Sequence, residues 1–372
     1  MIYLDHAATT PLRPEAIEAM EPFLRGRFGN TSGSHDISRR VKNVLEEARE
    51  TAAELLGATR DEVLFTAGGT EADNLAIKGA AALPARGGVV TVATEHEAVL
   101  ESAHYLERMG SKLDIVGVDR RGIVEPGEVG AAVGRDTAIV SVMTVNNETG
   151  TIQPVAQVIE AVKRSNPSTL FHTDAVQAFS TVDLTLSGSG VDLMSLAAHK
   201  FGGPQGVGLL YIRSGVDVEP LLHGGGQEYG RRSGTHNVAG IAGMAAAMAA
   251  AAADRDRFRR EVGEARRAFE AKLSDRAERT VPEAVSGPQH CHLRFEEENE
   301  TLLVRLDRLG VAASAGSACQ SGAATVSHVL SAMGLTRDQA RHSLRFSFGW
   351  DSTVAEAERA AELVIEALEG RS

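Results

Sequence analysis

Five short runs rich in apolar and β-branched residues point to the fold: VLFT (63–66), GVVTVAT (88–94), AIVSVMTV (138–145), TLFHTDA (169–175) and GVGLLYIR (206–213). Between them lie stretches with helical spacing, over residues 71–82, 98–109 and 154–165. Strands that alternate with helices are typical of βαβ units in a mostly parallel sheet. The sequence therefore predicts an α/β fold, with functional residues on the loops at the carboxyl ends of the strands.

The pattern changes beyond residue 240. An alanine-rich stretch passes into a charged amphipathic pattern from Asp254 to about Arg276, and the next strand pattern is His290–Phe295. Residues 353–369 again show helical spacing. A chain of 372 residues exceeds the usual size of one domain. We therefore expect a large domain over residues 13–250 and a smaller α+β domain formed by residues 1–12 and 251–372.

Composition argues against several classes of protein. Apolar residues make up 43% and charged residues 24%, as in ordinary globular proteins. The net charge of −12 and the scattered basic pairs argue against direct nucleic-acid binding, which needs clustered Lys and Arg. The apolar stretch 244–253 is too short to cross a membrane, and residues 1–6 lack the pattern of a secretory signal. We expect a cytoplasmic protein that binds neither nucleic acid nor a membrane.

The two cysteines have different surroundings. They lie 28 positions apart without a C-x-x-C pair, which argues against a disulfide framework or a structural zinc site. Cys291 alternates like a strand residue in QHCHLRF, so we interpret it as a core thiol, with His290 and His292 on the opposite face. Cys319 lies among small residues in SAGSACQSGAA (314–324), and we interpret it as the reactive thiol. No metal site is expected.

A lysine and an upstream aspartate form the first candidate pair. Lys200 follows an apolar run and precedes a glycine-rich turn, so it is either a surface lysine or a Schiff-base lysine. Asp174 ends a predicted strand 26 residues earlier, which leaves room for a helix and a strand between them. It is either a helix N-cap or the carboxylate that keeps the ring nitrogen of pyridoxal phosphate protonated. Gln177 follows Asp174 by three residues. Asp174 and Lys200 together are a more specific signal than either residue alone.

Two further loops follow predicted strands. Gly68, Gly69 and Thr70 precede a helical pattern, where backbone N–H groups bind phosphate, although paired glycines are also common in plain turns. His96 follows GVVTVAT and is either a capping histidine or a ring that stacks on a cofactor and transfers protons. Both loops are expected at the same edge of the sheet as Asp174.

Taken together, the segments resemble the cysteine desulfurases of the aminotransferase class V group, which are pyridoxal-phosphate enzymes of fold type I. The motifs occur in family order along nearly the whole chain: YLDHAATTP (3–11), FTAGGTEADN (65–74), TEHEAVL (94–100), VNNETG (145–150), HTDAVQ (172–177), HKFGGP (199–204), HGGGQE (223–228), RRSGT (231–235), SAGSAC (314–319) and SLRFSFG (343–349). The resemblance implies an aspartate-aminotransferase-like fold, with a large cofactor-binding domain and a small domain that carries the catalytic cysteine.

The resemblance also implies a role for each matching residue. Lys200 would bind pyridoxal 5'-phosphate covalently, Asp174 would pair with its ring nitrogen, and Gln177 would donate to its phenolic oxygen. His96 would stack on the ring and transfer protons. The phosphate would be held by Gly69, Thr70 and His199, with Thr235 from the other subunit of a homodimer. The substrate would be bound by Asn30, Asn147 and Arg345, with Asn147 also contacting the cofactor.

The implied reaction converts L-cysteine to L-alanine and transfers the sulfur to Cys319 as a persulfide. An acceptor protein would receive it for iron–sulfur cluster assembly or for tRNA or DNA thiolation. The small-residue loop resembles the long loop of the housekeeping type. A selenocysteine lyase or another class V enzyme is the alternative, and a catalytically silent partner protein is a third possibility, which the intact cofactor residues disfavour. Ala197 and Gln320 depart from the family pattern, which commonly has Ser and Thr there.

Overall fold

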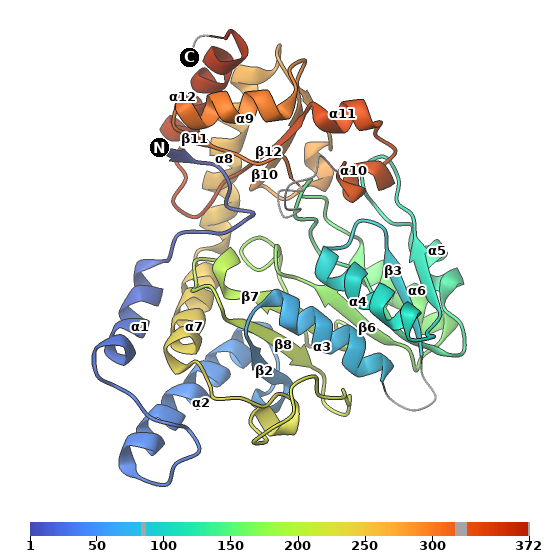
Figure 1. The fold of residues 1–372 in the computed structure, drawn as a ribbon, viewed down its shortest axis with the longest axis vertical. Coiled ribbons are helices and arrows are strands. Elements are labelled where there is room, and N and C mark those ends of the chain that lie inside the picture. Colours follow the sequence, from blue (N-terminus) through green and yellow to red (C-terminus); the bar gives the residue numbers. More distant parts are fainter. Residues whose placement is uncertain (83–86, 317–325, 371–372) are drawn as a thin grey trace.

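The computed structural model of the protein describes residues 1–82, 87–316 and 326–370. Its larger part is built on a seven-stranded sheet, drawn in the lower half of Figure 1. The strands occur in the order β2 (Val63–Thr66), β8 (Gly208–Ile212), β7 (Leu193–Ala197), β6 (Leu170–Asp174), β5 (Thr137–Ser141), β3 (Gly88–Val92) and β4 (Leu113–Val116). In this sheet β8 runs in the direction opposite to the other six strands, so the predicted α/β fold with a mostly parallel sheet is confirmed.

Both faces of the large sheet are covered because alternate strand residues point to opposite sides. On one face, Leu64, Ile139 and Leu210 pack with α3 (Gly69–Ala81) and α4 (Glu97–Arg108). On the other, Phe65, Val140 and Leu209 pack in one cluster with the buried sides of the remaining helices of this part. These are α1 (Pro14–Arg25), α2 (Asp36–Leu56), α5 (Pro126–Ala132), α6 (Val155–Ser165) and α7 (Val238–Ala253).

A smaller unit lies above the large sheet in Figure 1. Its antiparallel sheet has the order β12 (Ser343–Ser347), β10 (His290–Arg294) and β9 (Glu278–Arg279), and β1 (Ile2–Tyr3) pairs with β11 (Val311–Ala312) nearby. Its helices are α8 (Arg255–Leu273), α9 (Asn299–Arg308), α10 (His328–Ala332), α11 (Arg337–Arg341) and α12 (Val354–Leu368). One apolar cluster joins Leu4 to residues between Phe258 and Ala367, which explains how the first residues belong with the C-terminal ones.

Helices α7 and α8 meet at a bend of 73° around Asp254. Helix α7 packs on α1 and α2, whereas α8 packs on α12. The predicted division at residue 250 stays a prediction, and this change of packing partners supports it. No single helix in the described ranges is long and apolar enough to cross a membrane, although the bent pair α7 and α8 reaches that length and composition when taken together.

Two sequence expectations were wrong in detail. Strand β4 was not among the five expected runs, and neither was β7, although a strand was expected between Asp174 and Lys200, because short apolar runs such as LMSLA have no periodicity that separates strand from helix. The helix expected between Asp174 and Lys200 is replaced by turns in this described segment. Asp183 accepts hydrogen bonds there from the backbone N–H and the hydroxyl of Thr185, and such local bonds compete with helix formation.

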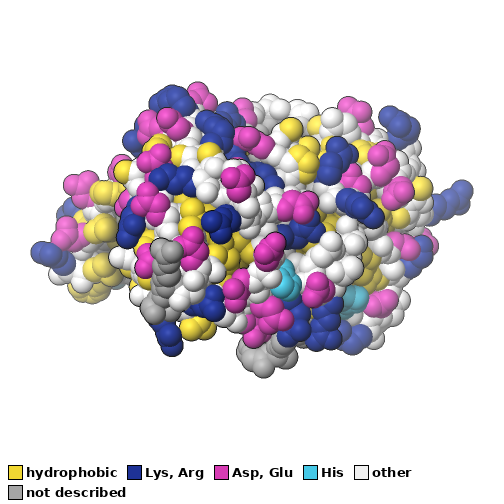
Figure 2. All heavy atoms as spheres, turned by 90° about the horizontal axis from the view of Figure 1, so that it is seen from above, with side chains coloured by type: hydrophobic (Ala, Val, Ile, Leu, Met, Phe, Trp, Pro, Cys, Tyr) yellow, Lys and Arg dark blue, Asp and Glu magenta, His cyan; other side chains and the backbone are white. Residues whose placement is uncertain are grey.

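Four short 3-10 helices complete the elements: η1 (Arg60–Glu62), η2 (Ala198–Lys200), η3 (Glu228–Gly230) and η4 (Glu283–Val285). Figure 2 looks onto the molecule from above, where basic and acidic side chains are interspersed. This face therefore shows no field of one sign.

Candidate active site

The predicted site residues gather where strands of the large sheet end. β6 ends at Asp174, and β7 runs directly into η2, which ends at Lys200. β3 leads to His96 at the start of α4, and β2 leads to Gly68 at the start of α3. These strands all point the same way, so their ends lie at one edge of the sheet. The predicted site residues of these four strands therefore lie at carboxyl ends, where functional residues were expected from the sequence.

Lys200 and Gln177 converge on the N-terminal segment. The Nζ of Lys200 donates to the carbonyl oxygens of Ala7 at 2.5 Å and Ala8 at 2.9 Å. The side-chain amide of Gln177 donates to the same Ala7 carbonyl at 2.8 Å. Sequence reasoning used YLDHAATTP only as part of the resemblance and gave Ala7 and Ala8 no role. The Ala7 carbonyl oxygen accepts from both side chains, and the Ala8 carbonyl oxygen accepts from Lys200 as well.

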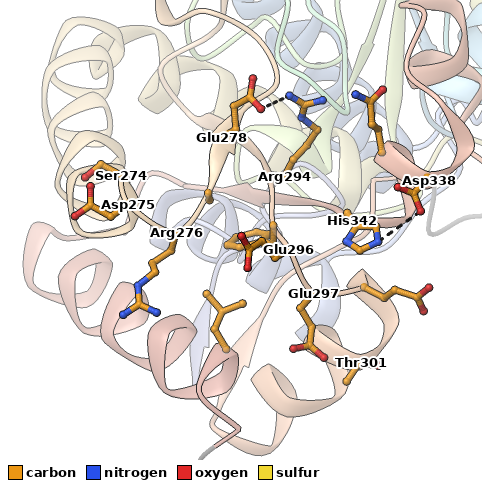
Figure 3. Close-up of a pocket in the computed structure, with 15 residues that line it drawn as sticks. Ser274, Asp275, Arg276, Glu278, Arg294, Glu296, Glu297, Thr301, Asp338 and His342 are labelled. Carbon is orange, nitrogen blue, oxygen red and sulfur yellow. Dashed lines mark ion pairs between the residues drawn. The ribbon is translucent and has the colours of Figure 1, made fainter.

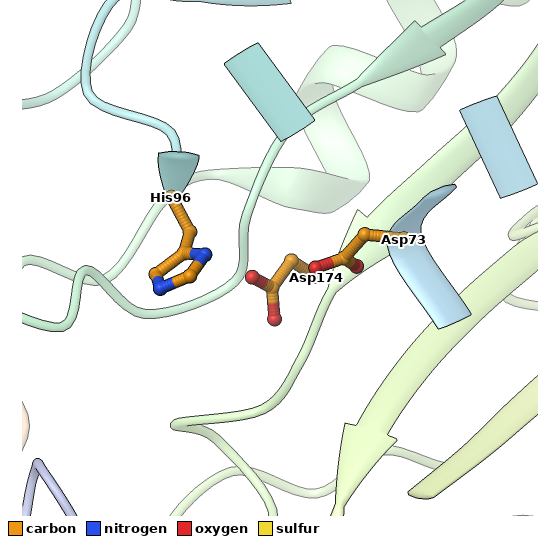
Figure 4. Close-up of side chains that lie close together, drawn as sticks. All are labelled: Asp73, His96 and Asp174. Carbon is orange, nitrogen blue, oxygen red and sulfur yellow. The ribbon is translucent and has the colours of Figure 1, made fainter. Parts of the chain in front are cut away.

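Asp174 and His96 lie together with a third side chain, Asp73 of α3 (Figure 4). One polar atom from each lies within 4.8 Å of the others. Burial raises the pKa of Asp174, and the nearby His96 and Lys200 oppose that rise. Burial lowers the pKa of His96, and Asp174 opposes that fall. Asp73, His96, Asp174 and Lys200 therefore form one electrostatically coupled group, with the buried Asp174 carboxylate at its centre.

The plainer interpretations of these two residues are also partly true. The Nδ1 of His96 accepts a hydrogen bond from the Ala98 N–H at 3.1 Å and so caps α4. A neutral His96 ring must then carry its proton on Nε2. Asp174 accepts from the Val176 N–H at 2.9 Å, which closes a turn rather than capping a helix. These bonds orient each side chain and leave its other polar atom for the site.

The residues expected to bind the phosphate, Gly69, Thr70 and His199, are among those that line a cavity of about 790 Å³ at the start of α3. A Cβ on Gly208 would overlap the backbone of Gly68, so only glycine permits this close approach of β8. Burial and the charge of Lys200 lower the pKa of His199 to about 4, and its Nδ1 lies 3.2 Å from the Thr9 hydroxyl. A neutral imidazole and helix N–H groups are suitable donors for a phosphate.

These donors fit pyridoxal phosphate. An amine from Lys200, a buried carboxylate from Asp174 for a ring nitrogen, an amide from Gln177 and an anion site at the start of α3 lie at one sheet edge. Thr70 also lines a second cavity together with His96, so the anion site and the His96 ring are neighbours. The donor set is what the cofactor's ring and phosphate require.

The residues expected to bind the substrate include Arg345 on the small sheet. The guanidinium of Arg345, a buried residue of β12, donates to the Asn147 carbonyl at 2.8 Å and to the Asp5 carboxylate at 2.6 Å. Its Nε is buried and has no hydrogen-bond partner in the part of the chain that the structure describes. Arg345 and Asn147 are thus brought together as expected. Asp5 was missed, although it lies in a quoted motif.

Arg345 pairs across the sheet with His292, and His290 lies on the same face two residues away. Burial, with the charge of Arg345 as a further cause, lowers the pKa of each histidine to about 3, so both rings are neutral. Cys291 points to the other face and is fully buried, which confirms the interpretation as a core thiol. Burial raises its pKa well above the usual range.

Thr235 and Asn30 are not brought to this site within one chain. Both are exposed and lie outside the set of described residues that line the phosphate cavity. Their loops meet each other instead, because the Thr31 hydroxyl lies 2.9 Å from the Nδ1 of His236. Glu228, beneath them, bonds to His236 at 2.7 Å and to Arg49 at 2.7 Å.

Cys319 lies outside the described residues, but both described ends of its segment meet one side chain. The hydroxyl of Ser327 donates to the Glu148 carboxylate at 2.6 Å. A Cβ built on Gly316 would lie 3.0 Å from the same carboxylate oxygen. Burial raises the pKa of Glu148, and a hydrogen bond from Ser327 opposes that rise. Glu148 was missed in the sequence, although it lies in the quoted VNNETG motif.

A wider cavity of about 1380 Å³ lies in the small unit, away from these residues (Figure 3). Its wall is rich in charge, but ion pairs hold several of these groups, including Arg294 with Glu278 and His342 with Asp338. It contains none of the predicted site residues that the structure describes. We therefore place the site at the edge of the large sheet, where the reactive groups meet.

The comparisons with known proteins agree on the family of this chain. A family model described as aminotransferase class-V matches residues 2–360. The chain is 44% identical over 359 residues to the cysteine desulfurase IscS of Dictyoglomus turgidum, covering 95% of this chain and 90% of that protein. The structure is similar to that of a NifS-like protein, with a TM-score of 0.94 and 37% identity over 99% of both chains. It is also similar to SspA in complex with cysteine, with a TM-score of 0.84 and 32% identity over 94% of this chain and 99% of that one.

Proposed function

The chain belongs to the cysteine desulfurases of the aminotransferase class-V family, and we propose that it converts L-cysteine to L-alanine with pyridoxal 5'-phosphate as cofactor. The family and fold type expected from the sequence are thereby confirmed. The observation that carries the proposal is the convergence of Lys200 and Gln177 on the Ala7 carbonyl, beside the Asp174 and His96 pair. The complex of the similar SspA with cysteine supports the substrate.

Each residue of the site has a task in this reaction. When bound, pyridoxal phosphate supplies an electron sink for the electrons left on the substrate's Cα after proton removal. Asp174 holds a negative charge against the protonated ring nitrogen, and Gln177 donates its amide to the phenolic oxygen. His96 moves a proton at Nε2, since its Nδ1 is held by Ala98. Lys200 provides the amine that binds the cofactor.

Arg345 binds the substrate carboxylate through its planar guanidinium. The buried Nε has no partner in the described residues, and a carboxylate can accept from it and from one Nη group at once. Its bonds to the Asn147 carbonyl and to Asp5 fix the plane of the group. We include Asn147 and Asn30 as further substrate contacts, Asn147 also toward the cofactor.

The sulfur leaves on Cys319. Its thiolate forms a bond to the substrate sulfur while the Cβ–S bond breaks, and the electron pair of that bond returns to the substrate carbon skeleton, which is protonated to alanine. The persulfide on Cys319 then passes to an acceptor protein, for iron–sulfur assembly or for tRNA or DNA thiolation. Glu148 accepts a hydrogen bond from Ser327 after the segment that contains Cys319 and lies close to Gly316 before it and to Arg345.

We also propose a homodimer, located in the cytoplasm. Thr235 and Asn30 are exposed and joined through the Thr31–His236 contact, so one surface presents both to a second copy. Thr235 would then complete the phosphate site of the other subunit. Light scattering of the cofactor-loaded enzyme is expected to give twice the chain mass. A monomer that retains the cofactor would refute this arrangement.

An absorbance spectrum with and without L-cysteine tests the proposed function. The purified enzyme is expected to show the yellow band of a lysine-bound cofactor, to change colour with L-cysteine, and to release alanine and, with a reductant, sulfide. Cys319→Ser should keep the band and lose alanine formation, and Cys291→Ser is the matched control. Absence of the band in the wild type, or alanine release by Cys319→Ser at the wild-type rate, would contradict the proposal.

A further inference from the structure

Asp73 is a buried carboxyl group to which the proposed reaction gives no task. It lies on α3 with 1% of its surface exposed, and its Oδ1 has no hydrogen-bond partner among the described residues. It faces Asp174, with polar atoms of the two side chains within 4.8 Å of each other (Figure 4). Two carboxylates this close cannot both be ionised without strong repulsion in a medium of low polarity.

The groups around Asp73 are Asp174 and His172 on β6, Ser195 on β7, Glu95 in the turn after β3, and His96, one ring nitrogen of which lies within 4.8 Å of a carboxyl oxygen of Asp73. The Nε2 of His172 lies 3.6 Å from Asp73, but its ring nitrogens are shared with the hydroxyls of Ser141 at 2.8 Å and Ser195 at 3.0 Å. Burial lowers the pKa of His172 to about 3, so this ring is neutral. Burial lowers the pKa of His96 as well, and the charged groups that act on Asp73 are the carboxyl groups of Asp174 and Glu95.

Asp174 is the carboxyl group of the pair that is better stabilised as an anion. It accepts a hydrogen bond from the Val176 N–H at 2.9 Å, and the nearby His96 and Lys200 lower its pKa. Burial raises the pKa of Asp73 well above its usual range, the Asp174 carboxylate raises it further, and a hydrogen bond with Ser195 lowers it in part. The two residues thus differ in surroundings, as do carboxyl pairs that divide one proton between them.

We propose that Asp73 is a positioning residue that holds the single proton of an Asp73–Asp174 pair, so that Asp174 faces the cofactor as the anion. The inference rests on the proposed function only for what Asp174 faces. The place of the proton depends on this chain's own residues. Ionisation of Asp73 would put a second negative charge behind Asp174, draw a proton onto that residue, and remove the anion from the ring nitrogen.

The sign of the pH dependence follows from the raised pKa. The folded protein keeps this proton to a higher pH than the unfolded chain does, so the free energy of unfolding falls as pH rises from the usual carboxyl range toward the folded-state pKa. Asp73→Asn resembles the neutral form in shape and cannot ionise. The wild type should therefore lose stability relative to Asp73→Asn as pH rises, whereas the two should converge near pH 4.

Infrared spectroscopy of the wild type locates the proton directly. A protonated carboxyl group has a C=O stretch that an ionised carboxylate lacks. Cofactor-free protein labelled with ¹³C in the aspartate carboxyl groups is expected to show an isotope shift of this band near neutral pH. A shift only after glutamate labelling would assign the proton to Glu95 or Glu148, whose pKa values burial also raises, and would overturn the proposal.

Variants then test the role toward the cofactor. Asp73→Asn should remove the aspartate band, whereas the matched variant Glu95→Gln should leave it in place. In the loaded wild type, the cofactor absorbance is expected to show an alkaline transition that Asp73→Asn lacks or that moves up by at least about one pH unit. Identical transitions in both proteins would overturn the proposal. A wild type that binds no cofactor would instead refute the proposed function and leave the infrared result to decide on Asp73.

Discussion

The large and the small sheet contribute to the site in different ways. The large sheet provides Asp174 at the end of β6, and His96 and Lys200 from the segments that follow β3 and β7. The small sheet provides Arg345 from the middle of β12, on a face shared with His292. The opposite face of β12 packs Phe346 into the apolar cluster of the small unit. One sheet is therefore used at its edge and the other on its face.

The difference shows what each arrangement requires. A residue at a strand end is placed by the direction of its own strand, so sheet topology alone brings several such residues together. A residue on a sheet face becomes part of a site only when another part of the molecule covers that face. For Arg345 the cover is the N-terminal segment, through Asp5, and the loop that contains Asn147.

The largest expected effect tests the residues at the edge of the large sheet. Lys200→Ala removes the amine that binds the cofactor, so turnover of L-cysteine should fall by about 10³-fold or more, within the range for loss of a group that transfers protons. The yellow band should be absent from the purified variant. Lys42→Ala, at an exposed position of α2, is the control. A variant at position 200 with wild-type turnover would mean that the strand-edge residues are not the site.

The next effect tests the residue on the face of the small sheet. Arg345→Lys keeps a positive charge but loses the planar pair of donors, which should cost about 2–4 kcal/mol of transition-state binding, or roughly 30- to 1000-fold in kcat/KM. The cofactor spectrum should be unchanged, because the cofactor-binding groups lie at the other sheet. Arg294→Lys on β10, whose side chain pairs with Glu278, is the matched control. An equal loss in both variants would show that Arg345 acts only through the small unit's stability.

Sequence reasoning reached the edge residues more fully than the face residues for this reason. The five runs predicted the sheet and its edge, and so Asp174, Lys200 and His96 in one place. Arg345 came only from the resemblance, because SLRFSF alternates like a strand with one face in water, whereas all five residues of β12 are buried. Asp73 was missed because a carboxyl group on a helix gives no sign that the helix buries it against a strand end.

A smaller effect should come from the contact between the loop after β5 and the start of α10. Glu148→Ala leaves the Ser327 hydroxyl, close to the end of the Cys319 segment, without its acceptor, at a cost of about 1–3 kcal/mol. Persulfide formation should slow by roughly tenfold, while the cofactor band stays. Glu148→Gln retains an acceptor oxygen and should recover most of the rate. Rapid-mixing measurements of persulfide formation decide this, and equal rates in Glu148→Ala and the wild type would show that the anchor is unimportant.

The smallest effect concerns the hidden face of the small sheet. Cys291→Ala removes one buried sulfur atom beside Phe346 and leaves a small void, which should lower the free energy of unfolding by about 1 kcal/mol in denaturant titrations. Persulfide transfer should be unaffected, because this thiol faces away from Arg345 and burial keeps it protonated. Cys319→Ala is the matched variant, with the opposite expectation of full activity loss at unchanged stability. If Cys291→Ala instead reduced turnover, the two faces of the small sheet would be coupled, and the distinction between a used face and a packed face would fail.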